Sequence, residues 1–96
     1  MPKAYWIAHV TVTQPDPYAI YAEGATEAFA AFGARVLARG GEIVGLEGEV
    51  RPRNVIVEFP DMETARACYD SDLYQSARKH REGAGEAQIM LLEGAG

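Results

Sequence analysis

Apolar and polar residues alternate along residues 5–12 (YWIAHVTV), a stretch rich in β-branched and aromatic side chains. Alternation over this length is typical of a strand that buries one of its two faces. Turn-forming residues (TQPDP) follow the stretch and are expected to end the strand. The more apolar face, which is expected to pack under helices, holds Ala4, Trp6, Ala8, Val10 and Val12.

The period changes over residues 16–33 (DPYAIYAEGATEAFAAFG), where aromatic and alanine residues recur at three- and four-residue steps. This spacing predicts an amphipathic helix. Asp16 is the expected N-cap, Pro17 suits the first turn, and Gly33 is the expected stop signal.

A second strand is predicted over residues 35–47, interrupted by Gly40 and Gly41. Glycine packs no side chain and weakens a strand interior, so a local feature of the backbone must explain why two glycines occur here. A Gly-Gly pair is also typical of a two-residue hairpin turn. The favoured interpretation is a bulge or kink that presents Arg39 at the bend to an acidic partner.

A short connection (GEVRPR) leads from this strand into a third predicted strand over residues 54–60. One broken helix or two short helices are then expected, with Asp61 as the first N-cap, a new start at Ser71 and an end at Gly83. Residues 87–94 (AQIMLLEG) read as the closing strand.

The predicted order, strand-helix-strand-strand-helix-strand, is that of an α+β, ferredoxin-like βαββαβ fold with an antiparallel sheet. In this fold the first strand lies between the third and fourth, the second forms an edge, and the helices cover one face. The other face stays open. An open apolar sheet face is a natural dimerisation surface, which favours a homodimer.

Length, charge and cysteine content narrow the class of protein. The 96 residues fit one domain over residues 1–96, and so short a chain gains from burying surface against a second subunit. The net charge of -5 argues against nucleic-acid binding. The single cysteine, Cys68, excludes an internal disulfide and a cysteine-ligated zinc site. Without a signal peptide or an apolar span of membrane length, a cytoplasmic protein with no membrane role is expected.

His9 and Glu58 are the candidate catalytic residues. Alternation places both on the open face, on neighbouring strands, where they could form an acid/base pair. Two structural alternatives remain: His9 as an interfacial histidine with a satisfied hydrogen bond, and Glu58 in an ion pair with Arg39 or Arg53.

The candidate ligand-binding residues are one arginine and several aromatic residues. Arg39 carries a planar guanidinium group that suits a carboxylate. Buried tyrosine hydroxyls need partners, so Tyr21 and Tyr69 are the favoured pocket residues among the aromatic side chains. No phosphate-binding loop, dinucleotide motif or metal-binding motif occurs, so neither a cofactor nor a metal is expected.

Five segments together resemble the family catalogued as domain of unknown function 1330: YWIAHVTV, FGARVLARGG, LEGEVRPRNVIVEFPD, ACYDSDLYQSARKHR and LLEG. The resemblance runs from about Tyr5 to Gly94. It implies a dimeric α+β barrel, in which two ferredoxin-like subunits pack sheet to sheet with their helices outside. It further implies a site between sheet and helices in each subunit, which would favour Trp6, Tyr21 and Tyr69.

The resemblance implies no particular activity, because similar barrels include monooxygenases, isomerases and plain ligand binders. Three functional hypotheses follow. The first is a dimer that binds a small aromatic or acidic metabolite in a pocket of each subunit. The second is a cofactor-independent, monooxygenase- or isomerase-like enzyme acting on such a metabolite. The third is a non-catalytic structural or interaction dimer.

Overall fold

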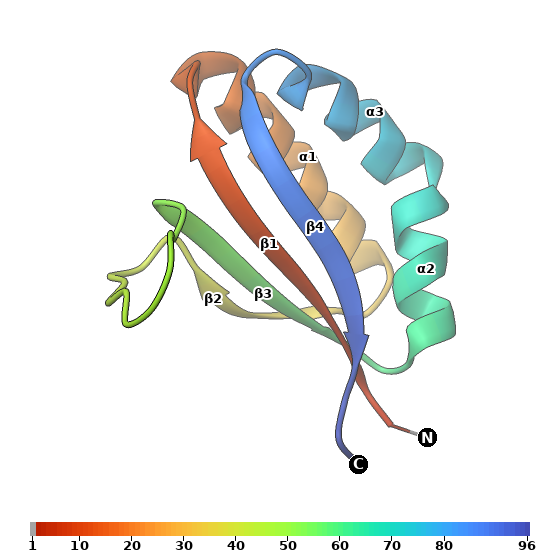
Figure 1. Cartoon of the computed structure of the whole chain (residues 1–96). Coiled ribbons are helices and arrows are strands. Elements are labelled where there is room, and N and C mark those ends of the chain that lie inside the picture. Colours follow the sequence, from red (N-terminus) through yellow and green to blue (C-terminus); the bar gives the residue numbers. More distant parts are fainter. Residues whose placement is uncertain (1) are drawn as a thin grey trace.

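The structure, a computed structural model, describes residues 2–96. Its four strands and three helices follow the predicted order, with the second helical region divided in two (Figure 1). The elements are β1 (Ala4–Val12), α1 (Pro15–Ala31), β2 (Arg35–Arg39), β3 (Arg53–Phe59), α2 (Met62–Asp70), α3 (Asp72–Arg81) and β4 (Gly85–Glu93).

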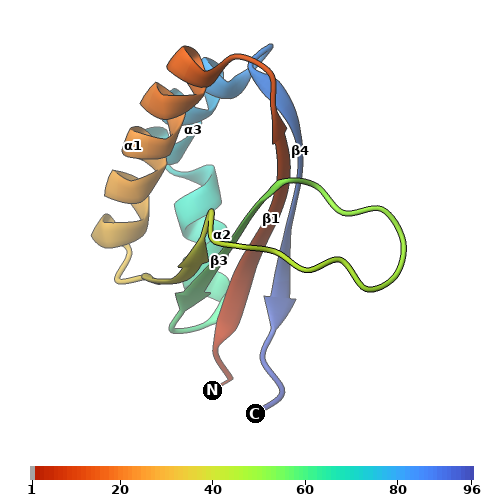
Figure 2. The ribbon, with the colours of Figure 1, turned by 90° about the vertical axis from the view of Figure 1, so that its left-hand side faces the viewer.

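The strands form one antiparallel sheet in the order β2-β3-β1-β4. As predicted, β1 lies between β3 and β4, and β2 forms an edge. All three helices cover the same face of the sheet, and the opposite face is left uncovered by helices (Figure 2). The ferredoxin-like α+β prediction is therefore confirmed.

The core lies between this sheet and the helices, on the face of β1 that the alternation predicted. Trp6 is 1% exposed and is the centre of an aromatic cluster. Its ring meets Phe29 edge-on at 5.1 Å and Tyr74 edge-on at 4.8 Å, measured between ring centroids. Such edge-to-face pairs add to the stabilisation from burial alone. The cluster therefore ties β1 to both α1 and α3.

Most of the predicted helix ends are confirmed. Asp61 Oδ1 accepts a hydrogen bond from the Thr64 N–H at 2.7 Å, and Ser71 Oγ accepts one from the Tyr74 N–H at 3.2 Å. Gly33 follows α1 with a φ of +69°, a backbone angle that glycine adopts without strain.

The prediction of Asp16 as N-cap is wrong. Gln14 occupies the N-cap position of α1, without a side-chain capping bond, and Pro15 is the first helical residue. Proline suits that position because its missing N–H would have no helical partner there. Asp16 lies instead in the first turn, where a carboxylate complements the positive end of the helix dipole.

The long second strand was also predicted wrongly, because β2 ends at Arg39. Gly40 turns the chain with a φ of +64°, and its N–H donates to the Asn54 carbonyl at 3.0 Å. Residues 41–52 hold no helix or strand and form a loop that stands off the open face of the sheet (Figure 2). We call it the 41–52 loop.

A bulge does occur in β2, but it precedes the glycines. Val36 pairs with Val57 and Ala38 pairs with Ile56, so Leu37 is an extra residue. The bulge reverses the alternation: Arg35, opposite Glu58, lies on the open face, whereas Arg39, opposite Val55, lies on the helix-covered face. Arg39 is therefore aimed by the bulge and not by Gly40-Gly41.

Candidate functional site

A narrow cleft between α1 and the sheet brings together three of the four predicted ligand-binding residues. We call it the α1 cleft. Its lining residues are Trp6, Ala8, Val10, Tyr18, Tyr21, Ala22, Ala25, Thr26, Phe29, Arg39, Arg53 and Val55. Its free volume is only about 30 Å³, comparable to the space of one water molecule in the liquid.

The α1 cleft opens outward into a larger depression, which we call the outer hollow. This depression has a volume of about 400 Å³ and is lined by Ala22, Glu23, Thr26, Glu27, Arg39 and Arg53. Arg39 and Arg53 line both spaces and so stand where the narrow cleft meets the hollow. A volume of this size is typical of small-molecule sites.

Arg39 reaches α1 rather than Glu58. Its Nη1 donates a hydrogen bond to Thr26 Oγ1 at 3.3 Å. The predicted pairing of Glu58 with Arg39 or Arg53 is wrong, because Glu58 Oε1 accepts instead from Lys3 Nζ at 3.2 Å. Within residues 2–96, neither arginine has a carboxylate at ion-pair distance. Both guanidinium groups therefore keep donors for a ligand.

Arg53 is a site residue that the sequence reasoning did not select. It shares the helix-covered face of β3 with Val55, and its Nε donates to the Tyr18 hydroxyl at 3.3 Å. Its guanidinium carbon lies 5.4 Å from the centre of the Tyr18 ring, a cation–π contact. The sequence does show that Arg53 alternates with the buried Val55 and Val57 and so shares their face of the strand. This was missed because the strand was predicted to begin one residue later, at residue 54.

Tyr21 and Tyr69 differ in their surroundings. The Tyr21 hydroxyl has the partner expected for a buried tyrosine, the Tyr74 hydroxyl at 2.8 Å, and burial raises the pKa of both side chains. Tyr69 packs against Trp6, with 5.8 Å between the ring centroids, but it lines another depression, beside Arg66 and Arg81. Tyr69 is therefore not part of the α1 cleft.

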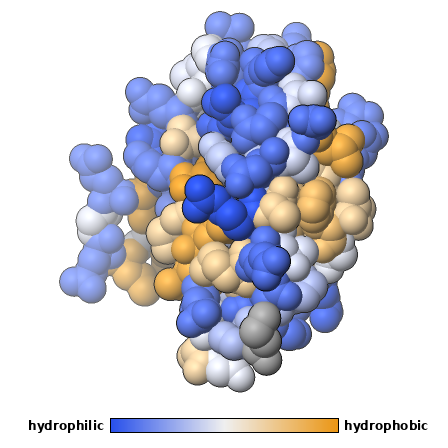
Figure 3. Space-filling view, turned by 90° about the vertical axis from the view of Figure 1, so that its right-hand side faces the viewer, coloured by the Kyte–Doolittle hydropathy of each residue, from blue (hydrophilic) through white to orange (hydrophobic). Residues whose placement is uncertain are grey.

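That other depression lies on the side of the molecule formed by α2, α3 and β4 (Figure 3). Hydrophobic residues gather across the middle of this side, below a hydrophilic upper part. Its volume is about 360 Å³, and β4 contributes most of its apolar lining. One buried nitrogen here, Arg81 Nε, has no hydrogen-bond partner among the described residues.

His9 and Glu58 both lie on the open face, as predicted, but the strand register separates them. His9 is opposite Asn54, and Glu58 is opposite Tyr5. The two positions are four residues apart along the paired strands, a distance of roughly 13 Å. They do not form an acid/base pair.

A polar depression surrounds His9 where the 41–52 loop meets the sheet, and we call it the sheet-face hollow. Its volume is about 700 Å³, and its lining residues are His9, Thr11, Ile43, Glu49, Val50, Arg51, Asn54, Glu86 and Gln88. His9 Nδ1 lies 2.6 Å from Asn54 Oδ1. No sequence pattern indicated this hollow, because residues 41–47 were predicted to continue a strand.

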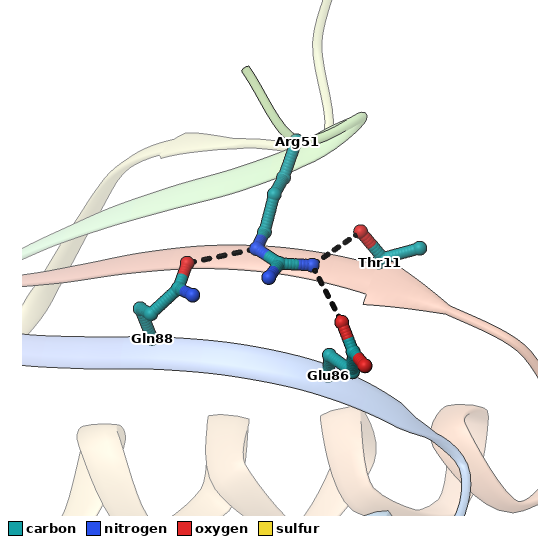
Figure 4. A network of polar contacts seen from close by, with 4 residues as sticks. All are labelled: Thr11, Arg51, Glu86 and Gln88. Carbon is teal, nitrogen blue, oxygen red and sulfur yellow. Dashed lines mark hydrogen bonds and ion pairs between the residues drawn. The ribbon is translucent and has the colours of Figure 1, made fainter. Parts of the chain in front are cut away.

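Arg51 anchors the end of the 41–52 loop to β1 and β4 (Figure 4). Its Nε donates to Gln88 Oε1 at 2.8 Å, and its Nη1 donates to Thr11 Oγ1 at 2.7 Å. Nη1 also forms an ion pair with Glu86 Oε2 at 3.3 Å. Arg51 is therefore occupied by protein partners, in contrast to Arg39 and Arg53.

The described part of the chain contains neither a membrane-spanning helix nor a metal-binding cluster. No helix within residues 2–96 combines the length and apolar character needed to cross a bilayer. The same residues contain no cluster of three or more histidine, cysteine or acidic side chains arranged to hold a metal ion.

Several solved structures share the fold. RPA0582, a protein of unknown function from Rhodopseudomonas palustris, is 20% identical with a TM-score of 0.71, and the match covers 99% of this chain and 84% of that chain. A dimeric ferredoxin-like protein of unknown function from Jannaschia sp. CCS1 is 12% identical with a TM-score of 0.67, covering 95% and 98%. SnoaB, a cofactor-independent oxygenase from Streptomyces nogalater, is 11% identical with a TM-score of 0.61, covering 96% and 92%.

Sequence comparison decides the family. No protein with a curated description matches the chain significantly. The family model described as Domain of unknown function (DUF1330), however, matches residues 3–95, nearly the whole sequence. The chain therefore belongs to this family, as the five segments predicted.

Proposed function

We propose that the chain is a homodimeric binding protein whose subunits each take up a small aromatic monocarboxylate in the outer hollow, at the mouth of the α1 cleft. The observation that carries this proposal is the placement of Arg39 and Arg53. Two guanidinium groups from adjacent strands stand at the opening of an aromatic cleft, and neither is paired with a carboxylate of residues 2–96.

The chemistry of the opening supports a carboxylate with an aromatic body. Guanidinium groups bind carboxylates through parallel, charge-assisted hydrogen bonds, which are stronger than hydrogen bonds between neutral groups. Because the α1 cleft itself has room for about one water, the ligand would lie mainly in the outer hollow. There its ring would contact the small side chain of Ala22 and the Arg53 guanidinium.

The rim of the outer hollow limits the charge of the ligand. Glu23 and Glu27 stand on this rim, and the protein carries a net charge of -5. Like charges in proximity oppose binding, so a second carboxylate on the ligand would be repelled. A monocarboxylate is therefore favoured over a dicarboxylate.

Benzoate is the simplest probe of this proposal, with benzyl alcohol as the uncharged analogue and phthalate as the dianion. We expect benzoate to bind with a measurable heat in titration calorimetry, and both other compounds to bind at least tenfold more weakly. Arg39→Gln and Arg53→Gln should each weaken benzoate binding about tenfold or more, since hydrogen bonds to charged groups contribute about 1.5–3 kcal/mol.

Arg35→Gln is the matched control. Arg35 lies on the same short strand as Arg39 but on the opposite face of the sheet, so its loss should leave benzoate binding unchanged. Equal losses of benzoate affinity in Arg35→Gln and Arg39→Gln would show that the effect comes from net charge alone. That result would count against a site in the cleft. Full affinity in both Arg39→Gln and Arg53→Gln would also overturn the proposal.

The homodimer is supported by the open face of the sheet. Ile7 of β1 pairs with Ile56 of β3 on one side and with Met90 of β4 on the other, which makes an apolar row across three strands. We call it the Ile7 row. Its outer members are exposed in the single chain, as are four apolar residues of the 41–52 loop, Ile43, Val44, Leu46 and Val50. A second copy would cover this patch, and the Jannaschia protein of the same fold is described as dimeric.

Sedimentation velocity tests the dimer. Met90→Lys would place an unpaired charge in the buried interface and should raise the dimer dissociation constant by about a hundredfold or more. Ile20→Lys serves as the control, because Ile20 is similarly exposed (53% against 50%) but lies on α1, on the other side of the sheet. A monomeric wild-type protein at micromolar concentration would contradict the dimer, as would an unchanged dimer in Met90→Lys.

A further inference from the structure

We infer, on the basis of the proposed function, that the ligand site extends along α1 past Arg53 and prefers a two-ring monocarboxylate whose second ring lies beside Tyr18 and Ala19. A further depression lies next to the outer hollow, and we call it the Pro15 hollow. Its volume is about 400 Å³, and its lining residues are Val12, Pro15, Tyr18, Ala19, Ala22 and Arg53.

The Pro15 hollow and the outer hollow are two parts of one groove along α1. Both are lined by Ala22 and Arg53. The α1 residues of the two linings follow one another at three- and four-residue steps from Pro15 to Thr26, and so form a single stripe on the helix. Because α1 lies on the side of the sheet away from the open face (Figure 2), the proposed homodimer leaves this groove uncovered.

Arg53 gives the ligand its direction in the groove. Its Nε donates to the Tyr18 hydroxyl at 3.3 Å, whereas its Nη1 would lie 2.8 Å from a Cβ atom at Gly40, the residue after Arg39. Because Nε is engaged by the protein, a carboxylate has to bind at the η nitrogens, on the side of Arg39 and the outer hollow. The remainder of the ligand then extends toward Tyr18 and the Pro15 hollow.

The two hollows differ in charge. Glu23 and Glu27 line the outer hollow, whereas the Pro15 hollow has no acidic lining residue within residues 2–96. Its lining is aliphatic apart from Tyr18 and Arg53. An aromatic ring placed there would bury apolar surface beside the guanidinium group. A polar group would lose water without gaining enough hydrogen-bond partners, so an uncharged ring is favoured.

The spacing along α1 sets the length of the ligand. Ala19 precedes Ala22 by three residues, which corresponds to about 4.5 Å along the helix axis. This rise is close to the separation between the centres of two directly joined phenyl rings. A biphenyl body with its first ring over Ala22 therefore brings its second ring over Ala19.

Two isomers test the inference, 4-biphenylcarboxylate and 2-biphenylcarboxylate, with benzoate as the one-ring reference. The isomers have the same composition and charge, but the second ring of the 2-isomer stands beside the carboxylate and cannot reach the Pro15 hollow. In titration calorimetry on the intact protein, burial of the second ring should make the 4-isomer bind about tenfold more tightly than benzoate. The 2-isomer should bind no more tightly than benzoate. Equal gains for both isomers, or no gain for the 4-isomer, would overturn the inference.

Ala19→Gln and Ala30→Gln form a matched pair of variants. Both alanines are exposed on α1, but only Ala19 lines the Pro15 hollow. Glutamine is a good helix former, so neither change should disturb the fold. Ala19→Gln places a polar side chain in the hollow and should weaken binding of the 4-isomer severalfold without altering benzoate binding. Ala30→Gln should alter neither. Unchanged affinity for the 4-isomer in Ala19→Gln would place the second ring elsewhere and overturn the inference.

The same ligands separate the failure of this inference from the failure of the proposed function. If neither benzoate nor 4-biphenylcarboxylate binds, the proposed function is overturned and the inference with it. If benzoate binds and the second ring adds nothing, the inference alone is overturned. Tighter binding of the 4-isomer that is weakened by both Arg39→Gln and Ala19→Gln supports both.

Discussion

The hydroxyl of Tyr21 on α1 lies 2.8 Å from the hydroxyl of Tyr74 on α3, and both side chains are buried. The two groups satisfy each other where water has no access. The Arg81 guanidinium lies 5.1 Å from the centre of the Tyr21 ring, so the pair has a cation beside it. This contact joins α1 to α3.

Tyr74→Phe should destabilise the protein by about 1–3 kcal/mol, because it leaves the Tyr21 hydroxyl buried without a partner. Chemical unfolding at neutral pH measures the loss. The double variant Tyr21→Phe/Tyr74→Phe removes both hydroxyls and should recover part of it. Strictly additive losses in this double-mutant cycle would show that the two hydroxyls do not interact.

Alkaline pH should destabilise the protein through buried groups whose pKa is raised. Burial raises the pKa of the Cys68 thiol to about 11, and burial raises that of Tyr21 and Tyr74 as well. In the unfolded chain the cysteine thiol ionises at about pH 8.5 and the two tyrosine hydroxyls ionise at about pH 10. The unfolded state then binds fewer protons than the folded state, so stability is complete below about pH 8.5 and falls as pH rises.

Each such group lowers the free energy of unfolding by up to about 1.4 kcal/mol per pH unit between its unfolded and folded pKa. Urea unfolding between pH 8 and pH 10 measures the slope. Cys68→Ala should flatten the slope in this interval, whatever its effect on overall stability. A slope identical to that of the wild type would show that Cys68 does not contribute to it.

Gly24→Ala should lower the melting temperature, although alanine normally favours a helix over glycine by about 1 kcal/mol. A Cβ atom at position 24 would lie 2.8 Å from the Cβ of Ala77, so α1 and α3 would have to separate. Overpacking of this kind costs typically about 1–3 kcal/mol. Thermal unfolding followed by circular dichroism provides the measurement.

The matched rescue for Gly24→Ala is the addition of Ala77→Gly, which restores the space between the helices. The double variant should unfold at a higher temperature than Gly24→Ala alone. If Gly24→Ala instead stabilises the protein, α1 and α3 do not approach each other as closely at this point as the structure indicates.

Gly40→Ala should weaken benzoate binding more than Gly48→Ala does. Both glycines have a positive φ, +64° and +72°, so alanine meets similar backbone strain at each. A Cβ at position 40 would also lie 2.8 Å from Arg53 Nη1, whereas nothing lies within 4 Å at position 48. Titration calorimetry on both variants compares them, and equal affinities would mean that Gly40 does not help to position Arg53.

Much of the fold could be predicted from local patterns. Alternation along β1 identified the buried face around Trp6, and the side chains of Asp61 and Ser71 marked two helix starts, because these signals act between neighbours in the sequence. The start of α1 was misplaced because Asp16 is a better capping residue than Gln14, while the position of Pro15 decided the outcome.

The candidate site was predicted only in part, because it depends on which residues of different strands face each other. Trp6, Tyr21 and Arg39 do meet at the α1 cleft. The separation of His9 from Glu58 follows from the register of β1 against β3, which the residues of one strand alone do not reveal. Likewise, the bulge at Leu37 is defined by the pairing of β2 with β3, and no residue type in β2 predicts it.

Arg35 and Arg39 are four positions apart and would share one face of an unbroken strand. The extra residue at Leu37 instead gives each side of the sheet one cation from β2: Arg35 faces the proposed dimer surface and Arg39 faces the ligand opening. Loss of a single residue in this short segment would move a positive charge from one side to the other without altering the composition of charges. Among related sequences, the length of the segment between these two arginines should therefore vary less than that of the 41–52 loop that follows it.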